Sequence, residues 1–169
     1  MLLIIKKVKM IYKEIKGNLI TLAKEGYFDV IAHGCNCFCT MGAGIAPQMA
    51  NAFNCDVFPL ENVEYSGDKD KLGKIDYKTL DVNGKALTVV NAYTQYGFGG
   101  RPFDYDAFKS IVAKMNSEFK GKHIGLPKIG AGLAGGHWPT IKQMINDGFT
   151  DCNVTVVQFS NQKLNKNEK

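Results

Sequence analysis

The segment FDVIAHGCN, residues 28–36, constrains the fold most, because it has the pattern of a strand without an exposed face. Nearly continuous apolar runs of this length are typical of parallel sheets, which helices cover on both faces. The residues that follow it, 40–50, pass through a glycine-rich turn into a helix, in which Pro47 fits only the first turn. A buried strand that leads through such a turn into a helix predicts an α/β fold.

Strand and helix patterns alternate through most of the remaining sequence. Alternating apolar and polar residues predict strands near 10–15 and 153–159, and apolar residues at helical spacing predict helices over 103–119 and 138–149. In the middle, two alternating runs flank Asn83 and Gly84, a dipeptide that favours a tight hairpin turn. We expect a mixed, largely parallel sheet between helices, in one domain over residues 1–160, with 161–169 as a disordered tail.

Composition narrows the class of protein further. The net charge is +5, but much of it comes from lysines within residues 6–9 and 163–169, so charge alone does not indicate a nucleic-acid-binding protein. The five cysteines are an odd number, and the apolar run at the start is far too short to cross a membrane. Its lysines also follow the apolar residues, unlike those of a signal peptide. We expect a cytoplasmic protein with reduced thiols and no membrane segment.

Two glycine-rich turns, residues 41–45 (the first loop) and residues 130–136 (the second loop), each follow a predicted strand and precede a predicted helix. Successive backbone N–H groups in such turns, together with the helix dipole, attract phosphate groups. Two of them could hold a diphosphate without a lysine or a metal ion. Neither loop matches the P-loop or the dinucleotide-binding pattern, and plain turn geometry explains each loop equally well.

The motif HGCNCFC, residues 33–39, raises the question of a metal site. On a strand, His33, Cys35, Cys37 and Cys39 would share one face, but their spacing is too wide for them to converge on one zinc ion. We therefore expect no metal, and interpret Cys35 and Cys37 as small packing residues. Cys39, which lies next to the first loop, is the least unfavourable candidate for a nucleophile, but this role is not favoured.

His33 and Asn36 are the residues of this motif whose side chains are best suited to catalysis or ligand binding. If the strand ends at a ligand site, His33 can donate or accept a proton near neutral pH, whereas the alternative is a satisfied core histidine. The Asn36 amide can bind a sugar diol through both a donor and an acceptor, or it can stabilise a local turn. Both alternatives stay open for each residue.

Beyond these local patterns, KGNLITLAKEGYFDVIAHGCNCFCTMGAGIAPQMA and IGLPKIGAGLAGGHWPTI together resemble the macrodomains, a family of ADP-ribose-binding modules. The resemblance extends from about residue 12 to residue 159 and includes the order and spacing of the two loops. The most similar branch is the ADP-ribose-1″-phosphate phosphatases. The resemblance implies a three-layer α/β/α macrodomain with a central mixed, largely parallel sheet.

The resemblance also implies a site. It assigns catalysis to His33 and Asn36, which would hydrolyse ADP-ribose 1″-phosphate to ADP-ribose and phosphate without a cofactor. Apart from the resemblance, a monomer is the default expectation. Asn18 stands where the family usually has an aspartate that binds adenine, and Asn36 would bind the distal ribose. The implied ligand-binding residues are Asn18, Leu19, Asn36, Gly42, Ala43, Gly44, Ile45, Gly130, Ala131, Gly132, Leu133 and Ala134.

Some positions depart from the family pattern. Relatives that remove ADP-ribosyl groups with a lysine nucleophile would have it near Thr94 or Gln95, and their loop aspartate falls near Ala134, so that chemistry is disfavoured. Family members commonly place an aromatic ring beside the distal ribose, which Ala134 cannot supply but Tyr96 or Phe98 could. The alternatives are therefore an ADP-ribose-binding module without catalysis, or a hydrolase acting on ADP-ribosylated protein or nucleic acid.

Overall fold

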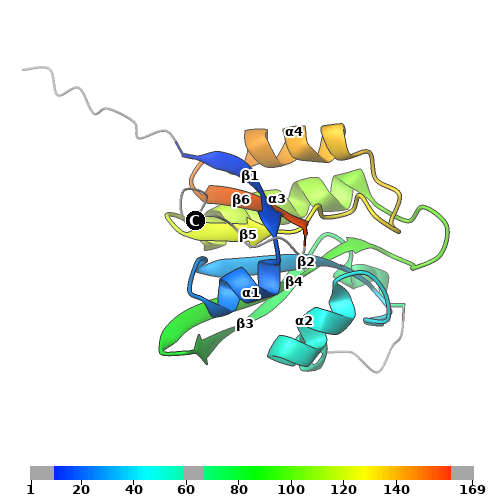
Figure 1. Cartoon of the computed structure of the whole chain (residues 1–169). Coiled ribbons are helices and arrows are strands. Elements are labelled where there is room, and N and C mark those ends of the chain that lie inside the picture. The colour runs from blue at the N-terminus through cyan, green and yellow to red at the C-terminus, as the bar shows by residue number, and fades with distance from the viewer. Residues whose placement is uncertain (1–9, 59–66, 161–169) are drawn as a thin grey trace, which may run out of the picture.

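The computed structural model describes residues 10–58 and 67–160 (Figure 1). The predicted tail, 161–169, lies outside the described residues, as do residues 1–9, so the predicted extent of the domain stays a prediction. In chain order, the helices and strands are β1 (Tyr12–Gly17), α1 (Leu19–Lys24), β2 (Val30–Asn36), α2 (Ala46–Phe53), β3 (Ile75–Val82), β4 (Lys85–Gln95), α3 (Tyr105–Glu118), β5 (His123–Leu126), α4 (Trp138–Gly148) and β6 (Asn153–Phe159), with short 3-10 turns at Cys55–Val57 and Lys69–Lys71.

Within the described residues, six strands form one sheet in the order β1-β6-β5-β2-β4-β3. Every neighbouring pair is parallel except β3 and β4, which form an antiparallel hairpin. Asn83 and Gly84 both have positive φ angles, 53° and 84°, as the tight turn of such a hairpin requires. The prediction of a mixed, largely parallel sheet is confirmed.

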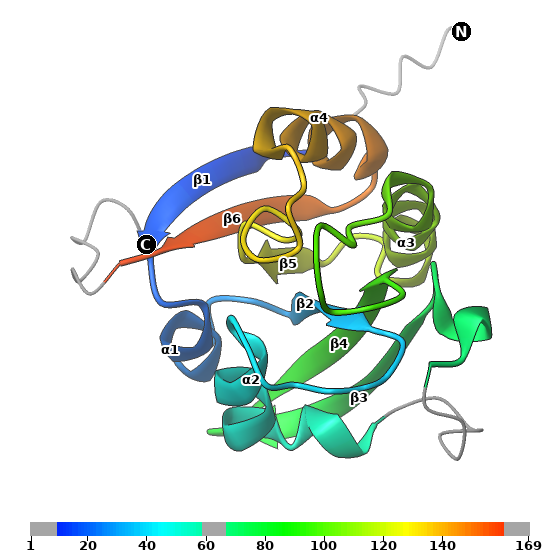
Figure 2. The same ribbon diagram turned by 90° about the vertical axis from the view of Figure 1, so that its right-hand side faces the viewer.

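Helices cover both faces of this sheet (Figure 2). Helices α3 and α4 pack against one face, where Ile111 and Ile145 belong to the same core cluster as Val30 of β2. Helices α1 and α2 pack against the other face, where Met49 joins Ile31, the neighbour of Val30 in β2. Successive residues of β2 thus enter opposite cores, which explains why its first three residues, Val30–Ala32, are all apolar. The architecture is the expected three-layer α/β/α sandwich.

The helices differ in how their N-termini are satisfied. The Asn18 side chain accepts a hydrogen bond from the Thr21 N–H at the start of α1 (3.1 Å), and Asp104 does the same for Ala107 in α3 (2.9 Å). Neither α2 nor α4 has a side-chain cap, and each has a proline in its first turn. These two helices are the ones that follow the glycine-rich loops, so their first N–H groups are not satisfied by a capping side chain.

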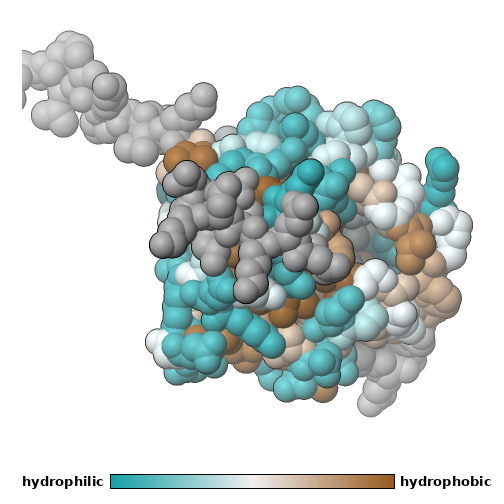
Figure 3. All heavy atoms as spheres, viewed as in Figure 1, coloured by the Kyte–Doolittle hydropathy of each residue, from teal (hydrophilic) through white to brown (hydrophobic). Residues whose placement is uncertain are grey.

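The surface seen in Figure 3 is largely hydrophilic, with hydrophobic residues in separate small areas, as expected when the apolar helix and sheet faces are turned inwards. Within residues 10–58 and 67–160, no helix is long and apolar enough to cross a membrane.

Gly125 of β5 gives a direct test of the packing between sheet and loop. A Cβ atom at this position would lie 2.8 Å from three ring atoms of the fully buried Phe28. We predict that Gly125→Ala lowers the free energy of unfolding by about 1–3 kcal/mol, because the core cannot accept the extra methyl group. Denaturant unfolding measures this, with Gly99→Ala as the control, since a Cβ there meets no atom within 4 Å. Equal free energies of unfolding for the two variants would contradict the close packing of Phe28 against Gly125.

Candidate functional site

The two glycine-rich loops lie at the same edge of the sheet. Strands β2 and β5 are parallel neighbours, so the first loop, which follows β2, and the second loop, which follows β5, begin side by side (Figure 2). Between them is a cleft of about 530 Å³, which we call the larger hollow. Its lining includes Gly42, Ala43, Gly44, Ile45, Gly130, Gly132, Leu133 and Ala134 from the two loops, and Gly34, Cys35, Asn36, Thr94 and Gln95 from the strand ends.

A second hollow of about 500 Å³, the smaller hollow, continues the cleft towards α1. The two hollows share lining residues from both loops and from the segment before the second loop, among them Gly44, Lys128 and Gly132. Its far end is lined by Asn18 and Leu19 and by the end of β6. The two hollows therefore form one elongated groove, and every ligand-binding residue that the resemblance implied lines part of it.

Backbone hydrogen bonds and close packing fix the shape of the second loop. The Gly136 N–H donates to the Gly130 carbonyl (2.8 Å), and the Gly135 N–H donates to the Gly132 carbonyl (3.1 Å). Gly130 has a φ of +76°, and its Cα faces the ring of Phe103 so closely that a Cβ would collide with it. Gly130 is therefore required by backbone conformation and by packing together.

In the turn before the first loop, Asn36 is already engaged. Its Nδ2 donates to the carbonyl and the hydroxyl of Thr40 (3.0 and 2.8 Å), and its Oδ1 accepts from the Phe38 N–H (2.9 Å). Asn36 also lines the larger hollow, although only 7% of it is exposed. Of its two possible roles, the structure shows the turn; ribose binding stays a prediction.

His33 lies elsewhere: it is fully buried and is not among the residues lining the groove. Its Nε2 is 2.7 Å from Oδ1 of Asn91, whose Nδ2 donates to Asp76 (2.8 Å) and to the Cys55 carbonyl (2.9 Å). Because these two bonds fix the orientation of the Asn91 amide, Oδ1 must accept, and Nε2 must carry the proton. Desolvation lowers the pKa of His33 to about 4. The structure thus places it as a neutral core histidine, and does not bring it to the groove.

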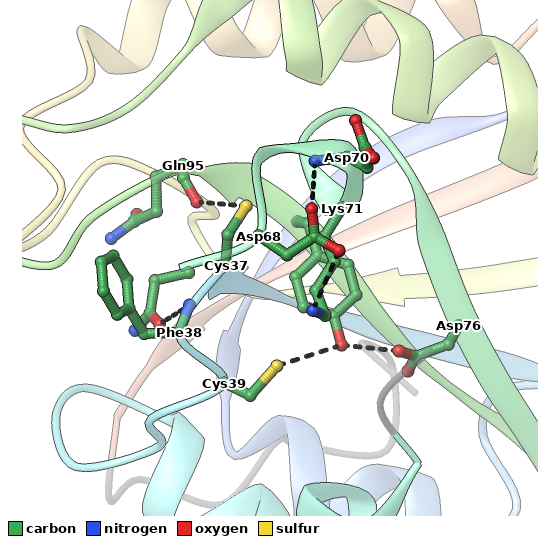
Figure 4. A network of polar contacts seen from close by, with 10 residues as sticks. Cys37, Phe38, Cys39, Asp68, Asp70, Lys71, Asp76 and Gln95 are labelled. Atoms are coloured by element: carbon green, nitrogen blue, oxygen red, sulfur yellow. Dashed lines mark hydrogen bonds and ion pairs between the residues drawn. The ribbon is translucent and has the colours of Figure 1, made fainter. Parts of the chain in front are cut away.

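The polar network continues from Asp76 towards the first loop (Figure 4). The Tyr93 hydroxyl donates to Asp76 (2.6 Å), and burial together with this carboxylate raises the pKa of Tyr93. The Cys39 thiol is 3.9 Å from the same hydroxyl, and Cys39 has a positive φ of 59°. Lys71, which is almost fully buried, forms an ion pair with Asp68 (3.7 Å). Through Cys39, this network contacts the turn between β2 and the first loop.

The cysteines of the motif lie in this region as packing residues. Cys35 and Cys37 are 4% and 0% exposed and form a small core with Tyr93. Desolvation raises the pKa of the Cys35 thiol, and it raises that of Cys37 to about 11, so both thiols are protonated near neutral pH. Among the described residues, no group of three or more histidine, cysteine or acidic side chains is arranged to hold a metal ion.

Several lining residues were not predicted from the sequence as binding residues. Lys128 lines both hollows, and its place in the motif LPKI directly before the second loop could have indicated it. Gln158 and Phe159 at the end of β6 line the smaller hollow without any local sequence signal. Of the two aromatic candidates, Phe98 lines the larger hollow and Tyr96 does not.

An α/β/α sandwich with paired glycine-rich loops at one sheet edge defines the fold as that of a macrodomain. The macrodomain of DarG from Thermus aquaticus superimposes with a TM-score of 0.62, at 21% identity, over 89% of this chain and 98% of that one. A Trypanosoma brucei macrodomain in complex with ADP-ribose superimposes with a TM-score of 0.53, at 14% identity, over 88% of this chain and 63% of that one.

At the level of sequence, no family model matches. The chain is 32% identical over 155 residues to an uncharacterized 17.5 kDa protein from the tk-vs intergenic region of Enterobacteria phage T4, covering 89% of this chain and 97% of the phage protein. This chain belongs to the same family as the phage T4 protein.

The burial of His33 makes stability depend on pH. The folded pKa, about 4, is below the ordinary value of 6.5, so between these values the unfolded chain binds more protons. The stability that the folded protein gains from keeping His33 neutral is therefore fully present above pH 6.5, and it is lost as the pH falls towards 4. We predict that, between pH 7 and pH 4, the free energy of unfolding falls by about 3 kcal/mol more in wild type than in His33→Gln. Denaturant unfolding at the two pH values measures this difference. Parallel pH profiles for the two proteins would show that His33 is exposed to solvent.

The second loop offers a matched pair of glycine variants. Gly130→Ala should lower the thermal unfolding midpoint by several degrees, because it adds a clash with Phe103 to a strained positive φ. Gly132→Ala should leave the midpoint within about a degree, since a Cβ there meets no protein atom within 4 Å. If Gly132→Ala proved as damaging as Gly130→Ala, the described loop geometry would be incorrect.

Proposed function

We propose that this protein binds ADP-ribose along the groove, with adenine in the smaller hollow, the diphosphate between the two loops, and the distal ribose in the larger hollow. The observation that carries the proposal is that both glycine-rich loops line one cleft, and that this cleft continues to Asn18 and Leu19. The Trypanosoma brucei macrodomain, which was solved in complex with ADP-ribose, has the same fold and supports the proposal.

The middle of the groove suits a diphosphate. Backbone N–H groups of the two loops supply donors, and the first turns of α2 and α4, which have no side-chain cap, add partial positive charge. Lys128 lines both hollows at this point and adds a full positive charge. Charge on the diphosphate can thus be balanced without a metal ion.

At the adenine end, Asn18 has chemistry that the usual aspartate lacks. Its Oδ1 already accepts from the Thr21 N–H and keeps a second lone pair for the adenine amino group. Its Nδ2 can also donate to a ring nitrogen. Because a neutral amide attracts the amino group less strongly than a carboxylate does, we expect Asn18 to bind adenine with a more modest contribution to affinity.

For catalysis, the reaction we propose is hydrolysis of ADP-ribose 1″-phosphate to ADP-ribose and phosphate. The loop N–H groups would stabilise the anionic phosphate, and Asn36 would shape the turn beside it. Among the described residues, however, the lining of the larger hollow contains no histidine and no carboxylate, and His33 is buried outside it. A missing general base costs roughly 10²–10⁴-fold in rate, so this observation favours a binding module without useful turnover as the alternative.

A modified macromolecule is the third candidate ligand. Leu133 and Phe98, which line the larger hollow, are 74% and 65% exposed, so the distal end of the groove is open. An ADP-ribosyl group attached to protein or nucleic acid could therefore enter.

All five cysteines are free, as in a reducing compartment, and we propose a monomer in the cytoplasm.

Calorimetric titration tests the binding proposal. ADP-ribose should bind more tightly than ADP, and ADP more tightly than AMP, because each added group occupies a further part of the groove. The phosphate-binding loops should make AMP the weakest ligand of the series. Absence of ADP-ribose binding at millimolar concentration, with the protein shown to be folded, would refute the proposed function.

Turnover distinguishes the versions of this proposal. Phosphate release from ADP-ribose 1″-phosphate selects the hydrolase, and tight binding without release selects the module. We expect any release to continue in His33→Ala, provided that this variant is assayed below its unfolding temperature, since His33 does not reach the groove. Loss of label from ADP-ribosylated protein or DNA would instead select the macromolecular substrate.

A further inference from the structure

Thr94, near the end of β4, stands at an irregularity of the sheet. Cys35 of β2 pairs with Tyr93, but the next residue, Asn36, pairs with Gln95, so Thr94 has no partner on β2. Such a β-bulge changes the direction of the side chain at the extra residue, and bulges are common beside active sites. Its backbone is held in place, because the Thr94 carbonyl accepts a hydrogen bond from the Asp104 N–H (2.9 Å).

The Thr94 hydroxyl is buried without a partner. The residue is 0% exposed, and among the described residues no group forms a hydrogen bond with its Oγ1. Leaving a buried hydroxyl unsatisfied costs about 1–3 kcal/mol, which native proteins rarely accept without a functional reason. A valine of the same shape would avoid this cost, so packing alone does not explain the threonine.

Thr94 belongs to the wall of the larger hollow, with its hydroxyl buried just behind the surface of that wall. Thr94 lines that hollow together with Gly34 and Ile129, and it is absent from the lining of the smaller one. A Cβ on Gly34 would lie 2.9 Å from the Thr94 Oγ1 and 3.4 Å from a side-chain carbon of Ile129. The absence of a side chain at Gly34 therefore leaves the space that the hydroxyl occupies.

We infer that the Thr94 hydroxyl is a specificity-determining group that hydrogen-bonds the distal ribose of the ligand. The inference rests on the proposed function, in which the larger hollow holds that ribose. A ribose presents hydroxyls that both donate and accept, and the loop N–H groups can only donate to them. Asn36, the other candidate, uses both amide atoms within its own turn. Thr40 also lines the hollow, but its hydroxyl accepts from Asn36.

The test compares two ligands on two variants. Thr94→Val removes the hydroxyl and keeps the shape, and Thr94→Ser keeps the hydroxyl. In calorimetry, Thr94→Val should bind ADP-ribose roughly 5- to 30-fold more weakly than wild type does, the factor expected from one lost hydrogen bond that leaves a ligand hydroxyl unpaired. Its affinity for ADP, which lacks the distal ribose, should stay the same, and Thr94→Ser should bind both ligands within about threefold of wild type.

Stability gives a second readout. Because the hydroxyl has no partner in the free protein, Thr94→Val should unfold at the same temperature as wild type or higher. If this variant does not fold, Thr94→Ala compared with Thr94→Ser carries the same ligand comparison.

Two outcomes overturn the inference. Unchanged ADP-ribose affinity in Thr94→Val would mean that an enclosed water serves the hydroxyl, and equal weakening of ADP-ribose and ADP would mean that the loops had been distorted. In both cases wild-type binding of ADP-ribose, and hence the proposed function, would stand. Wild type that binds neither ligand would refute the proposed function itself.

Discussion

The parallel pairing of β2 with β5 is the constraint on which the rest of the structure depends. Because the two strands point the same way, the loops that follow them meet at one edge of the sheet, and each loop leads into a helix without a side-chain cap. Two sets of backbone donors and two helix dipoles therefore face one cleft. A register that separated these strands would leave two ordinary glycine turns and no groove.

In the core below this edge of the sheet, buried polar side chains hydrogen-bond to one another and do not face the groove. His33, Asn91, Asp76 and Tyr93 connect β2, β3 and β4 by hydrogen bonds, below the turn that leads to the first loop. Inside a protein such networks hold their members in a single arrangement. The described lining of the groove, by contrast, is made mainly of glycine, small apolar residues and amide or hydroxyl groups, which suits the binding of an anion more than proton transfer.

How far the sequence could predict this depends on whether each signal is local. The hairpin at Asn83 and Gly84, the buried strand β2 and the two loops were predicted, because their conformations are set by neighbouring residues. Whether His33 stays in the core or reaches the ligand edge was left open, since a strand buried on both faces gives no sign of which residue reaches that edge. The role now proposed for Thr94 was not predicted for a similar reason: a bulge depends on the register between β2 and β4, which no local pattern encodes. The end of β6 joins the groove only through its parallel pairing with β1 and β5.

The most direct measurement is an NMR titration of ¹⁵N-labelled protein with ADP-ribose, followed through the backbone amides. We predict that the largest chemical-shift changes occur together in residues 42–45 and 130–134, because both loops contact one diphosphate. Shifts confined to one loop, or centred on the separate hollow lined by Lys24, Phe53 and Val57, would contradict it.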